Sequence, residues 1–285
     1  MLYTKLRTEE RLILEAMRRR GVQPDLISDE AVLLHLDRPW EAYDAVLSRS
    51  LGHWRGLHAL WVLETWGVPT LNNSGVAGVC GNKLLTTLAL LRAGLPVPRT
   101  AVTFSPATAK QALAELGYPA VAKPVVGSWG RLLARLSTPE EADAVLEHKA
   151  ALASPLNHVY YLQQYVNKPG RDIRSFVVGN ETICAIYRYS SHWITNTARG
   201  GAAAPCPVAP EIDRLSRAAA RAVGGGAVAV DLLEDGDGRL LVNEVNHTME
   251  FRNATAVTGI DIAGRLVDLL LDLAQPSARG GGVAC

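Results

Sequence analysis

The sequence is poor in cysteine, and its four cysteines follow no metal-binding pattern. Cys80, Cys184, Cys206 and Cys285 form no Cys-x-x-Cys pair, and no histidine spacing near them would complete a zinc site. This absence argues against structural zinc and indicates a protein that stays reduced.

Excess charge and long apolar runs are also missing. Lysine and arginine total 29 against 28 acidic residues, so a net charge of +1 gives no general attraction to nucleic acid or anionic lipid. No stretch approaches the roughly 18–20 apolar residues of a membrane span. Residues 1–10 carry charge where a signal peptide needs an apolar core. We therefore expect a soluble, cytoplasmic protein without a nucleic-acid or membrane partner.

The sequence does contain enough apolar side chain for a substantial core. Hydrophobic residues make up 48% of the sequence and charged residues 20%, which argues against disorder. The length of 285 residues suggests about two domains. Helical patterns alternate with short apolar runs, as is typical of α/β folds. We predict helices at residues 9–20, 51–66, 83–93, 106–116, 139–150 and 211–223, and strands at 68–71, 118–124, 159–166, 173–178 and 182–187.

Proline and glycine breaks divide the chain. Pro96 and Pro98 end the first helical unit, and Lys-Pro-Gly at 168–170 interrupts the chain again. The opening run, residues 1–3, is very short for a first strand, which leaves open a truncated start of the first unit. The predicted units are an N-terminal α/β domain at residues 1–95, a central lobe at 96–166, a C-terminal lobe at 167–276 and a flexible tail at 277–285.

A predicted β-hairpin near residue 237 brings three oxygen-bearing side chains together. Asp-Gly between two apolar runs is a strong hairpin signal. A two-residue loop at Asp237-Gly238 places Asp231 directly opposite Glu244, with Asn246 on the same face. Opposed carboxylates repel unless a cation or an arginine lies between them. Two carboxylates and an amide oxygen suit Mg²⁺, and a solvated hairpin face is the alternative interpretation.

A second candidate is a lysine followed by a glycine-bearing turn. Lys123 lies at the end of a predicted strand, four residues before Gly127, and Gly130 and Arg131 follow. Such a turn directs backbone N–H groups at phosphate oxygens, with the lysine as a point charge. No Walker A or dinucleotide-binding glycine pattern is present, so an ordinary surface turn is the competing interpretation.

Together with a basic cluster at residues 188–201, these residues resemble the ATP-grasp fold. Within that fold the chain resembles the RimK-like carboxylate–amine ligases of the LysX group, which join α-aminoadipate to the carrier protein LysW. The similarity extends over nearly the whole chain and implies an α/β (α+β) ATP-grasp fold preceded by an N-terminal α/β pre-ATP-grasp domain. The stretches that carry it are Gly-Ser-Trp-Gly-Arg-Leu-Leu (127–133), Lys-Pro-Gly-Arg-Asp-Ile-Arg (168–174), His-Trp-Ile-Thr-Asn-Thr-Ala-Arg-Gly-Gly (192–201) and Val-Asn-Glu-Val-Asn-His-Thr-Met-Glu-Phe (242–251).

The resemblance implies a site for ATP and Mg²⁺. Lys83 and Lys123 would contact ATP phosphates, and Arg199 would be the catalytic residue that steadies the transferring phosphoryl group. One or two Mg²⁺ ions would be held by Asp231, Glu244 and Asn246. The other nucleotide-binding residues would be Gly127, Ser128, Trp129, Gly130, Arg131, Leu132, Leu133, Gln163, Gln164, Tyr165, Val166, Asp172, Arg174 and Asn196.

The resemblance also implies the reaction and its partners. The γ-carboxylate of the carrier's C-terminal glutamate would attack ATP, and the α-amino group of α-aminoadipate would then displace phosphate from the acyl phosphate. No cysteine nucleophile is needed, so Cys80 and Cys184 are expected to pack. The partners would be a small acidic LysW-like carrier and the amino acid, in lysine biosynthesis, and the enzyme would be a homo-oligomer, a dimer or a tetramer. The amino-acid pocket would comprise Arg188, Thr197, Ala198, Glu250, Phe251, Arg252, Asn253 and Ala254.

Three positions depart from the family pattern. Gln164 stands where glutamate is usual, and Tyr189 where a second basic residue is expected. Asn253-Ala254 stands where LysX members carry asparagine followed by threonine or serine and arginine-pathway members carry Gly-Phe. Glutamate is therefore an alternative substrate, in an arginine-pathway or dual-function ligase. A non-catalytic nucleotide-binding regulatory protein is a further alternative, which the intact Arg199 and metal-binding residues disfavour.

The substitution Arg199→Ala is predicted to lower kcat by on the order of 10²–10³ with little change in the KM for ATP. The reason is that this arginine would act on charge that develops in the transition state. Steady-state kinetics with varied ATP measure both constants. A large rise in KM at constant kcat would instead assign Arg199 to ground-state binding.

Overall fold

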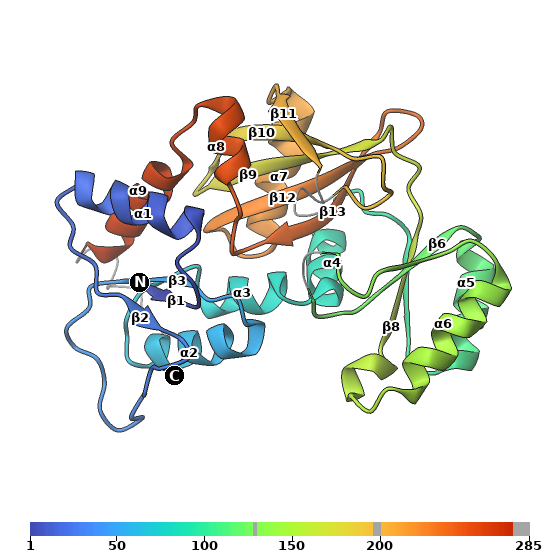
Figure 1. Cartoon of the computed structure of the whole chain (residues 1–285), viewed down its shortest axis with the longest axis horizontal. Helices are drawn as coiled ribbons and strands as arrows, with labels where there is room; N and C mark the ends of the chain where they lie inside the picture. Colours follow the sequence, from blue (N-terminus) through green and yellow to red (C-terminus); the bar gives the residue numbers. More distant parts are fainter. Residues whose placement is uncertain (128–129, 196–200, 276–285) are drawn as a thin grey trace.

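The computed structural model describes residues 1–127, 130–195 and 201–275, and its strands form three sheets (Figure 1). Each sheet is built from one stretch of the chain, at residues 2–71, 100–164 and 171–246. All the helices and strands predicted above are present within a few residues of their expected ends. In this part of the chain no single helix is long and apolar enough to span a membrane, and α3 (Ser74–Cys80) and α4 (Lys83–Arg92) pass that test only as a pair bent by 102°.

The first sheet is parallel and belongs to the N-terminal part of the chain. Its elements are β1 (Leu2–Tyr3), α1 (Thr8–Arg19), β2 (Ile27–Ser28), β3 (Val46–Arg49), α2 (His53–Thr65) and β4 (Thr70–Leu71). The strand order is β2-β1-β3-β4, so the very short β1 lies inside the sheet. Helix α2 packs on the sheet through Ala59 and Leu63, which are buried with Leu2 and Val46.

The second sheet is antiparallel and forms the lobe drawn in green in Figure 1. Its elements are β5 (Thr100–Thr103), α5 (Pro106–Leu116), β6 (Ala120–Lys123), β7 (Ala134–Leu136), α6 (Pro139–Ala151), the 3₁₀ helix η1 (Pro155–His158) and β8 (Tyr160–Gln164), and the strand order is β5-β8-β6-β7. Ser105 and Thr138 cap α5 and α6 through their side chains, and a proline follows each cap. These two helix starts therefore arise from local sequence.

The third sheet is antiparallel and has helices on both faces. Its elements are β9 (Arg171–Val178), β10 (Glu181–Tyr189), β11 (Ala202–Cys206), α7 (Pro210–Ala222), β12 (Ala227–Glu234), β13 (Leu240–Asn246), α8 (Arg252–Thr258) and α9 (Ile262–Ala274), and the strand order is β11-β10-β9-β12-β13. Val177 and Val228 are buried with Leu215 of α7, whereas Phe176 and Ala229 are buried with residues of α1, α8 and α9. Alternate residues of each strand thus serve two cores. Helix α4 packs against β13 and α7, which brings Lys83 to this sheet.

The β12–β13 hairpin reaches the predicted pairing by an unexpected route. A hydrogen bond from Asp235 N to Arg239 O (3.0 Å) closes a three-residue loop, so the predicted two-residue loop is wrong. Near the loop Leu232 pairs with Val242, whereas Asp231 pairs with Glu244, as predicted. The extra residue is Asn243, which forms a β-bulge. The bulge compensates for the longer loop and restores the Asp231–Glu244 pair.

Two side chains of the first sheet tie it to the third sheet. Asn72, directly after β4, hydrogen-bonds both the N–H and the carbonyl of Ala227 at 2.7 Å and donates to His247 O at 2.7 Å. Gly226 permits this approach, because a Cβ there would lie 2.0 Å from Asn72 Oδ1. Arg49, at the end of β3, donates to Met249 O at 3.0 Å. The segment that follows β13 is therefore held by the first sheet.

Arg49 is itself held by a buried carboxylate of α1. Its guanidinium lies 2.8 Å from Glu10 Oε1, and the two side chains are 2% and 0% exposed. Burial opposes ionisation of Glu10, but its contacts with Arg7 and Arg49 outweigh burial and lower its pKa. This stabilising contribution is therefore present above the ordinary glutamate pKa and is lost as the pH falls through the lowered pKa.

The substitution Glu10→Gln is expected to lower the free energy of unfolding by about 3–5 kcal/mol, because it leaves the buried Arg49 without its charged partner. Urea denaturation at neutral pH measures the change. The control Glu15→Gln lies on the same helix, where Glu15 and its partner Arg19 are 61% and 51% exposed. That control should change the free energy by less than about 1 kcal/mol, and equal losses in the two variants would contradict the assignment.

Candidate active site

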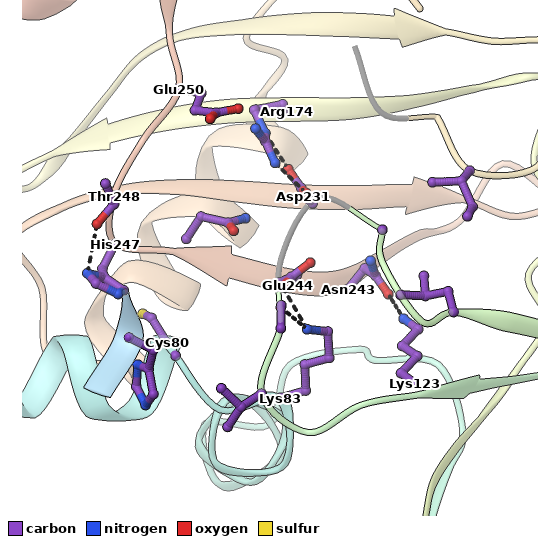
Figure 2. A pocket seen from close by; sticks show the side chains of 18 of the residues that line it. Cys80, Lys83, Lys123, Arg174, Asp231, Asn243, Glu244, His247, Thr248 and Glu250 are labelled. Atoms are coloured by element: carbon purple, nitrogen blue, oxygen red, sulfur yellow. Dashed lines mark hydrogen bonds and ion pairs between the residues drawn. The ribbon is translucent and has the colours of Figure 1, made fainter. Parts of the chain in front are cut away.

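A cavity of about 480 Å³ lies where the three sheets meet, and residues of all three sheets line it. Six of the described lining residues are lysine or arginine, and four are aspartate or glutamate. This excess of positive charge suits a polyanionic ligand. Figure 2 shows Lys83 and Lys123 reaching from one side of the cavity toward Glu244 and Asn243 on β13.

Lys83 is the first residue of α4, and the start of this helix is fixed on both sides. The Asn82 side chain caps the helix by accepting from two backbone N–H groups, and Lys83 N donates to Val125 O at 2.8 Å. Lys83 Nζ donates to Gly127 O at 2.7 Å and lies 3.4 Å from Glu244 Oε1. The ammonium group thus joins the glycine loop to the predicted metal-binding strand.

Lys123 ends β6 and reaches the same strand from the second sheet. Its Nζ donates to Gln163 Oε1 at 2.6 Å and to Asn243 Oδ1 at 3.1 Å. Burial lowers the pKa of Lys123 to about 8, and the nearby Glu244 carboxylate opposes this shift. An anionic phosphate in the cavity would supply the charge that favours the protonated form.

Residues 163–166, predicted to bind the nucleotide, also line the cavity. Gln163 and Gln164 end β8, and Tyr165 and Val166 follow. The Arg135 guanidinium lies 4.5 Å from the centroid of the Tyr165 ring, and the Trp193 ring centroid lies 6.4 Å from it. This aromatic and cationic packing fixes Tyr165 at the cavity wall.

The glycine loop is described in part. Gly127, Gly130 and Leu133 line the cavity. Leu132, by contrast, is 79% exposed, and neither it nor Arg131 is among the lining residues. The predictions for Ser128, Trp129, Asn196, Thr197, Ala198 and Arg199 lie outside the described residues.

Two arginine–aspartate pairs are buried in the wall formed by the third sheet. Arg174 lies opposite Asp231 and donates to its two oxygens at 2.7 and 2.8 Å. Arg188 lies opposite Asp172, binds both of its oxygens at 2.7 Å and reaches Asp231 Oδ2 at 3.1 Å. Burial opposes ionisation of Asp231, but the charges of Arg174 and Arg188 lower its pKa to about 2. Arg188, predicted to belong to the amino-acid pocket, is thus already bound by two aspartates.

The residues predicted to bind metal line the cavity together. Asp231, Glu244 and Asn246 offer two carboxylates and one amide, and Asn246 Nδ2 is buried without a hydrogen-bond partner in the described structure. Within the described ranges no cluster of three or more His, Cys, Asp or Glu side chains is arranged to hold a metal ion. A divalent ion would therefore depend on this mixed set, whose oxygen donors fit Mg²⁺.

The predicted amino-acid pocket is divided between cavity and core. Glu250 lines the cavity and pairs with Arg7 at 2.7 Å. Phe251 and Ala254 are fully buried in the core beneath the third sheet. Arg252 and Asn253, in the first turn of α8, are not among the residues that line this cavity.

Several polar residues of the cavity were not predicted from the sequence. Lys168 donates to Thr195 Oγ1 at 2.6 Å, and its place in the matched stretch at 168–174 was an available signal. Because of the bulge, Asn243 lines the cavity together with its neighbour Glu244, and Arg7 arrives from the distant N-terminal end of the chain. Burial, with smaller effects of His53 and Arg49, lowers the pKa of His247 to about 4, so this ring is neutral at physiological pH. For Arg7 the sequence carried no local signal, whereas Asn243 and His247 lie in the matched stretch at 242–251, which was an available signal.

The buried cysteines supply no nucleophile. Cys80 lines the cavity and Cys184 lies in the core, and both side chains are buried. Burial raises the pKa of both thiols, that of Cys184 to about 11. Because the thiolate is the reactive form, the predicted packing role is consistent with their placement.

Comparison with known families accounts for most of the chain. Residues 80–270 match the RimK-like ATP-grasp domain, and residues 1–79 match the LysX preATP-grasp domain. The chain belongs to the RimK-like ATP-grasp family. It is therefore an ATP-dependent ligase, and the fold class predicted from the sequence is confirmed for both parts of the chain.

Individual RimK-like relatives are similar over most of their length. The α-aminoadipate–LysW ligase LysX of Saccharolobus solfataricus is 35% identical over 92% of this chain and 96% of its own. The glutamate–LysW ligase ArgX of Sulfolobus acidocaldarius is 33% identical over 92% of this chain and 94% of its own. The crystal structure of a RimK domain ATP-grasp protein from Sphaerobacter thermophilus gives a TM-score of 0.78 at 26% identity, covering 95% of this chain and 98% of that chain. Relatives of both substrate classes thus resemble this ligase to a similar degree.

Neutralising Asp231 and neutralising Glu244 should have different effects on the stability of the protein. Asp231→Asn leaves the buried Arg188 and the half-buried Arg174 facing an uncharged partner and should lower the free energy of unfolding by about 3–5 kcal/mol. Glu244, 27% exposed and 3.4 Å from Lys83, should tolerate Glu244→Gln with a loss below about 1 kcal/mol. Urea unfolding without nucleotide measures both values. A larger loss for Glu244→Gln than for Asp231→Asn would contradict the assignment of Asp231 as the carboxylate that balances the two arginines.

Proposed function

We propose that this RimK-like ligase joins α-aminoadipate to a small acidic carrier protein of the LysW type in lysine biosynthesis. Support comes from the similarity to LysW ligases over more than nine-tenths of the chain and from the LysX-type N-terminal domain. The structural observation that carries the proposal is one continuous cavity lined by Lys83, Lys123, the Asp231–Glu244 pair and Glu250. Ligation through an acyl phosphate requires nucleotide and both substrates to meet in such a space.

The first step activates the carrier. A γ-carboxylate oxygen of its C-terminal glutamate attacks the γ-phosphorus of ATP, the bond to ADP breaks, and an acyl phosphate forms. Lys83 and Lys123 bind phosphate oxygens and neutralise their charge. Asp231, Glu244 and Asn246 would hold Mg²⁺, which would neutralise further phosphate charge. The protein contributes positioning and electrostatic stabilisation, without a covalent enzyme intermediate.

The second step forms the amide. The uncharged α-amino group of the amino acid attacks the acyl carbon, the bond to phosphate breaks, and the nitrogen gives up a proton to the departing phosphate. Glu250 is the described carboxylate suited to orient the substrate ammonium before attack, because it lines the cavity away from the two buried aspartates. Its ion pair with Arg7 fixes the carboxylate, so the N-terminal domain takes part in binding the amine.

The preference for α-aminoadipate rests on the segment after Glu250. The chain has Asn253-Ala254 where arginine-pathway members carry Gly-Phe. Ala254 is fully buried, so a bulky side chain at this position would repack α8 against the core. This position would therefore act on specificity by shifting the segment that carries Glu250.

Release of ADP by the purified protein should require both an amino acid and a carrier ending in glutamate. We expect kcat/KM for α-aminoadipate to exceed that for glutamate by roughly 10–200-fold, the range that one methylene supports. The control is the same carrier with its terminal glutamate changed to glutamine, which cannot form the acyl phosphate. Equal or higher kcat/KM for glutamate would replace the proposal with an arginine-pathway or dual-function ligase. Absence of ADP release with either amino acid would favour the non-catalytic alternative.

A further inference from the structure

Asp172 is a buried carboxylate that is contacted by other side chains of the cavity wall. Its side chain is 6% exposed and accepts hydrogen bonds from Arg188 and from the Thr195 hydroxyl. Lys168 Nζ lies 3.9 Å from Oδ2 and also donates to Thr195. Since these groups occupy both oxygens, the carboxylate is engaged by the cavity wall and not by the predicted metal-binding set.

Arg188 links Asp172 to Asp231. Two of its N–H groups bind Asp172 at 2.7 Å, and Nη2 also lies 3.1 Å from Asp231 Oδ2. Asp231 already accepts two hydrogen bonds from Arg174, at 2.7 and 2.8 Å. A carboxylate has about four lone-pair positions. Three cationic N–H contacts therefore leave Asp231 about one position for a further ligand.

Asp172 determines how many N–H groups of Arg188 can contact Asp231, because it engages two of them itself. Without the charge of Asp172, Arg188 would keep Asp231 as its one carboxylate partner within hydrogen-bond distance. Bidentate pairing with a carboxylate is the preferred arrangement of a guanidinium group, and it is strong in a buried site. Arg188 would then fill the remaining position on Asp231 and repel an incoming divalent cation.

We propose that Asp172 is a positioning residue that holds Arg188 away from the last free position of Asp231 and so keeps that position available to Mg²⁺. The inference rests on the metal site of the proposed function and is independent of which amino acid or carrier is joined. It separates the two buried aspartates into one that binds the ion and one that restrains a competing arginine.

The test measures Mn²⁺ binding to the protein–ADP complex by electron paramagnetic resonance, without carrier or amino acid. Asp172→Asn should raise the apparent Kd for Mn²⁺ by on the order of 10- to 100-fold, as for other residues that support metal ligands. Adding Arg188→Met to this variant should restore the Kd to within about threefold of the parent, because the competing guanidinium is then absent. Restoration by removing a second charge is a result that general destabilisation does not produce.

A matched control lies on β9 and β12, the strands that carry Asp172 and Asp231. Arg171 of β9 pairs with Glu234 of β12 at 3.0 Å, and neither residue lines the cavity. Glu234→Gln should leave Mn²⁺ affinity unchanged, and an equal loss there would overturn the proposal.

Other outcomes also decide the proposal. An unchanged Kd in Asp172→Asn, or a double variant as weak as the single one, would overturn a role through Arg188. If Asp172→Asn does not fold, Arg188→Met alone remains decisive: unchanged or tighter Mn²⁺ binding supports the proposal, and a tenfold loss overturns it. Failure of the parent protein with ADP to bind Mn²⁺ would overturn the metal site itself, whereas a failed carrier or amino-acid assay would leave this inference standing.

Discussion

The bulge at Asn243 is the constraint on which the cavity wall depends, because side chains alternate strictly between the two faces of an unbroken strand. Continued regular pairing from Leu232–Val242 would set Asn243 opposite Asp231 and turn Glu244 to the other face. With one residue added, Glu244 faces Asp231 and Asn243 still meets Lys123 at 3.1 Å. Lys123 of the second sheet and the carboxylate and amide oxygens of the third sheet are thereby brought to the same cavity.

Features set by neighbouring residues were predictable from the sequence. The helices predicted at 106–116 and 139–150 begin where expected, because a hydroxyl cap (Ser105, Thr138) followed by proline acts within one turn. Helix α3 shows where such reasoning fails: no helix was predicted after the strand at 68–71, but the Asn73 side chain caps α3 by accepting from Val76 N at 2.9 Å. Turns and N-caps use the same residue types, so sequence alone does not separate them. The predicted length of the hairpin loop was wrong for a related reason. A three-residue loop followed by a bulge gives the same Asp231–Glu244 pair as a two-residue loop, and the bulge leaves no sequence signature of its own.

Residues of the candidate site were predictable where a sequence motif names them. Which partners a charged residue takes there was not predictable where it depends on the pairing of distant strands. Lys83, Lys123, Asp231 and Glu244 were all selected from the sequence, and the structure places them around one cavity. The engagement of Arg188 by two aspartates depends on the register of β9, β10 and β12, which no single segment encodes. Long-range pairing thus limits what a sequence says about the role of a charged residue, even when its presence in the site is expected.

The hydrogen bonds that join the first sheet to the segment after β13 have a consequence for synthesis of the chain. Their partners are far apart in sequence: 155 residues separate Asn72 from Ala227, 200 separate Arg49 from Met249, and 243 separate Arg7 from Glu250. A ribosome makes the first sheet early, but the Glu250 carboxylate and the Met249 carbonyl reach Arg7 and Arg49 only after residue 250 has left the exit tunnel. The cavity is therefore complete only after the third sheet has been synthesised, so nucleotide bound there cannot assist the folding of the nascent N-terminal part.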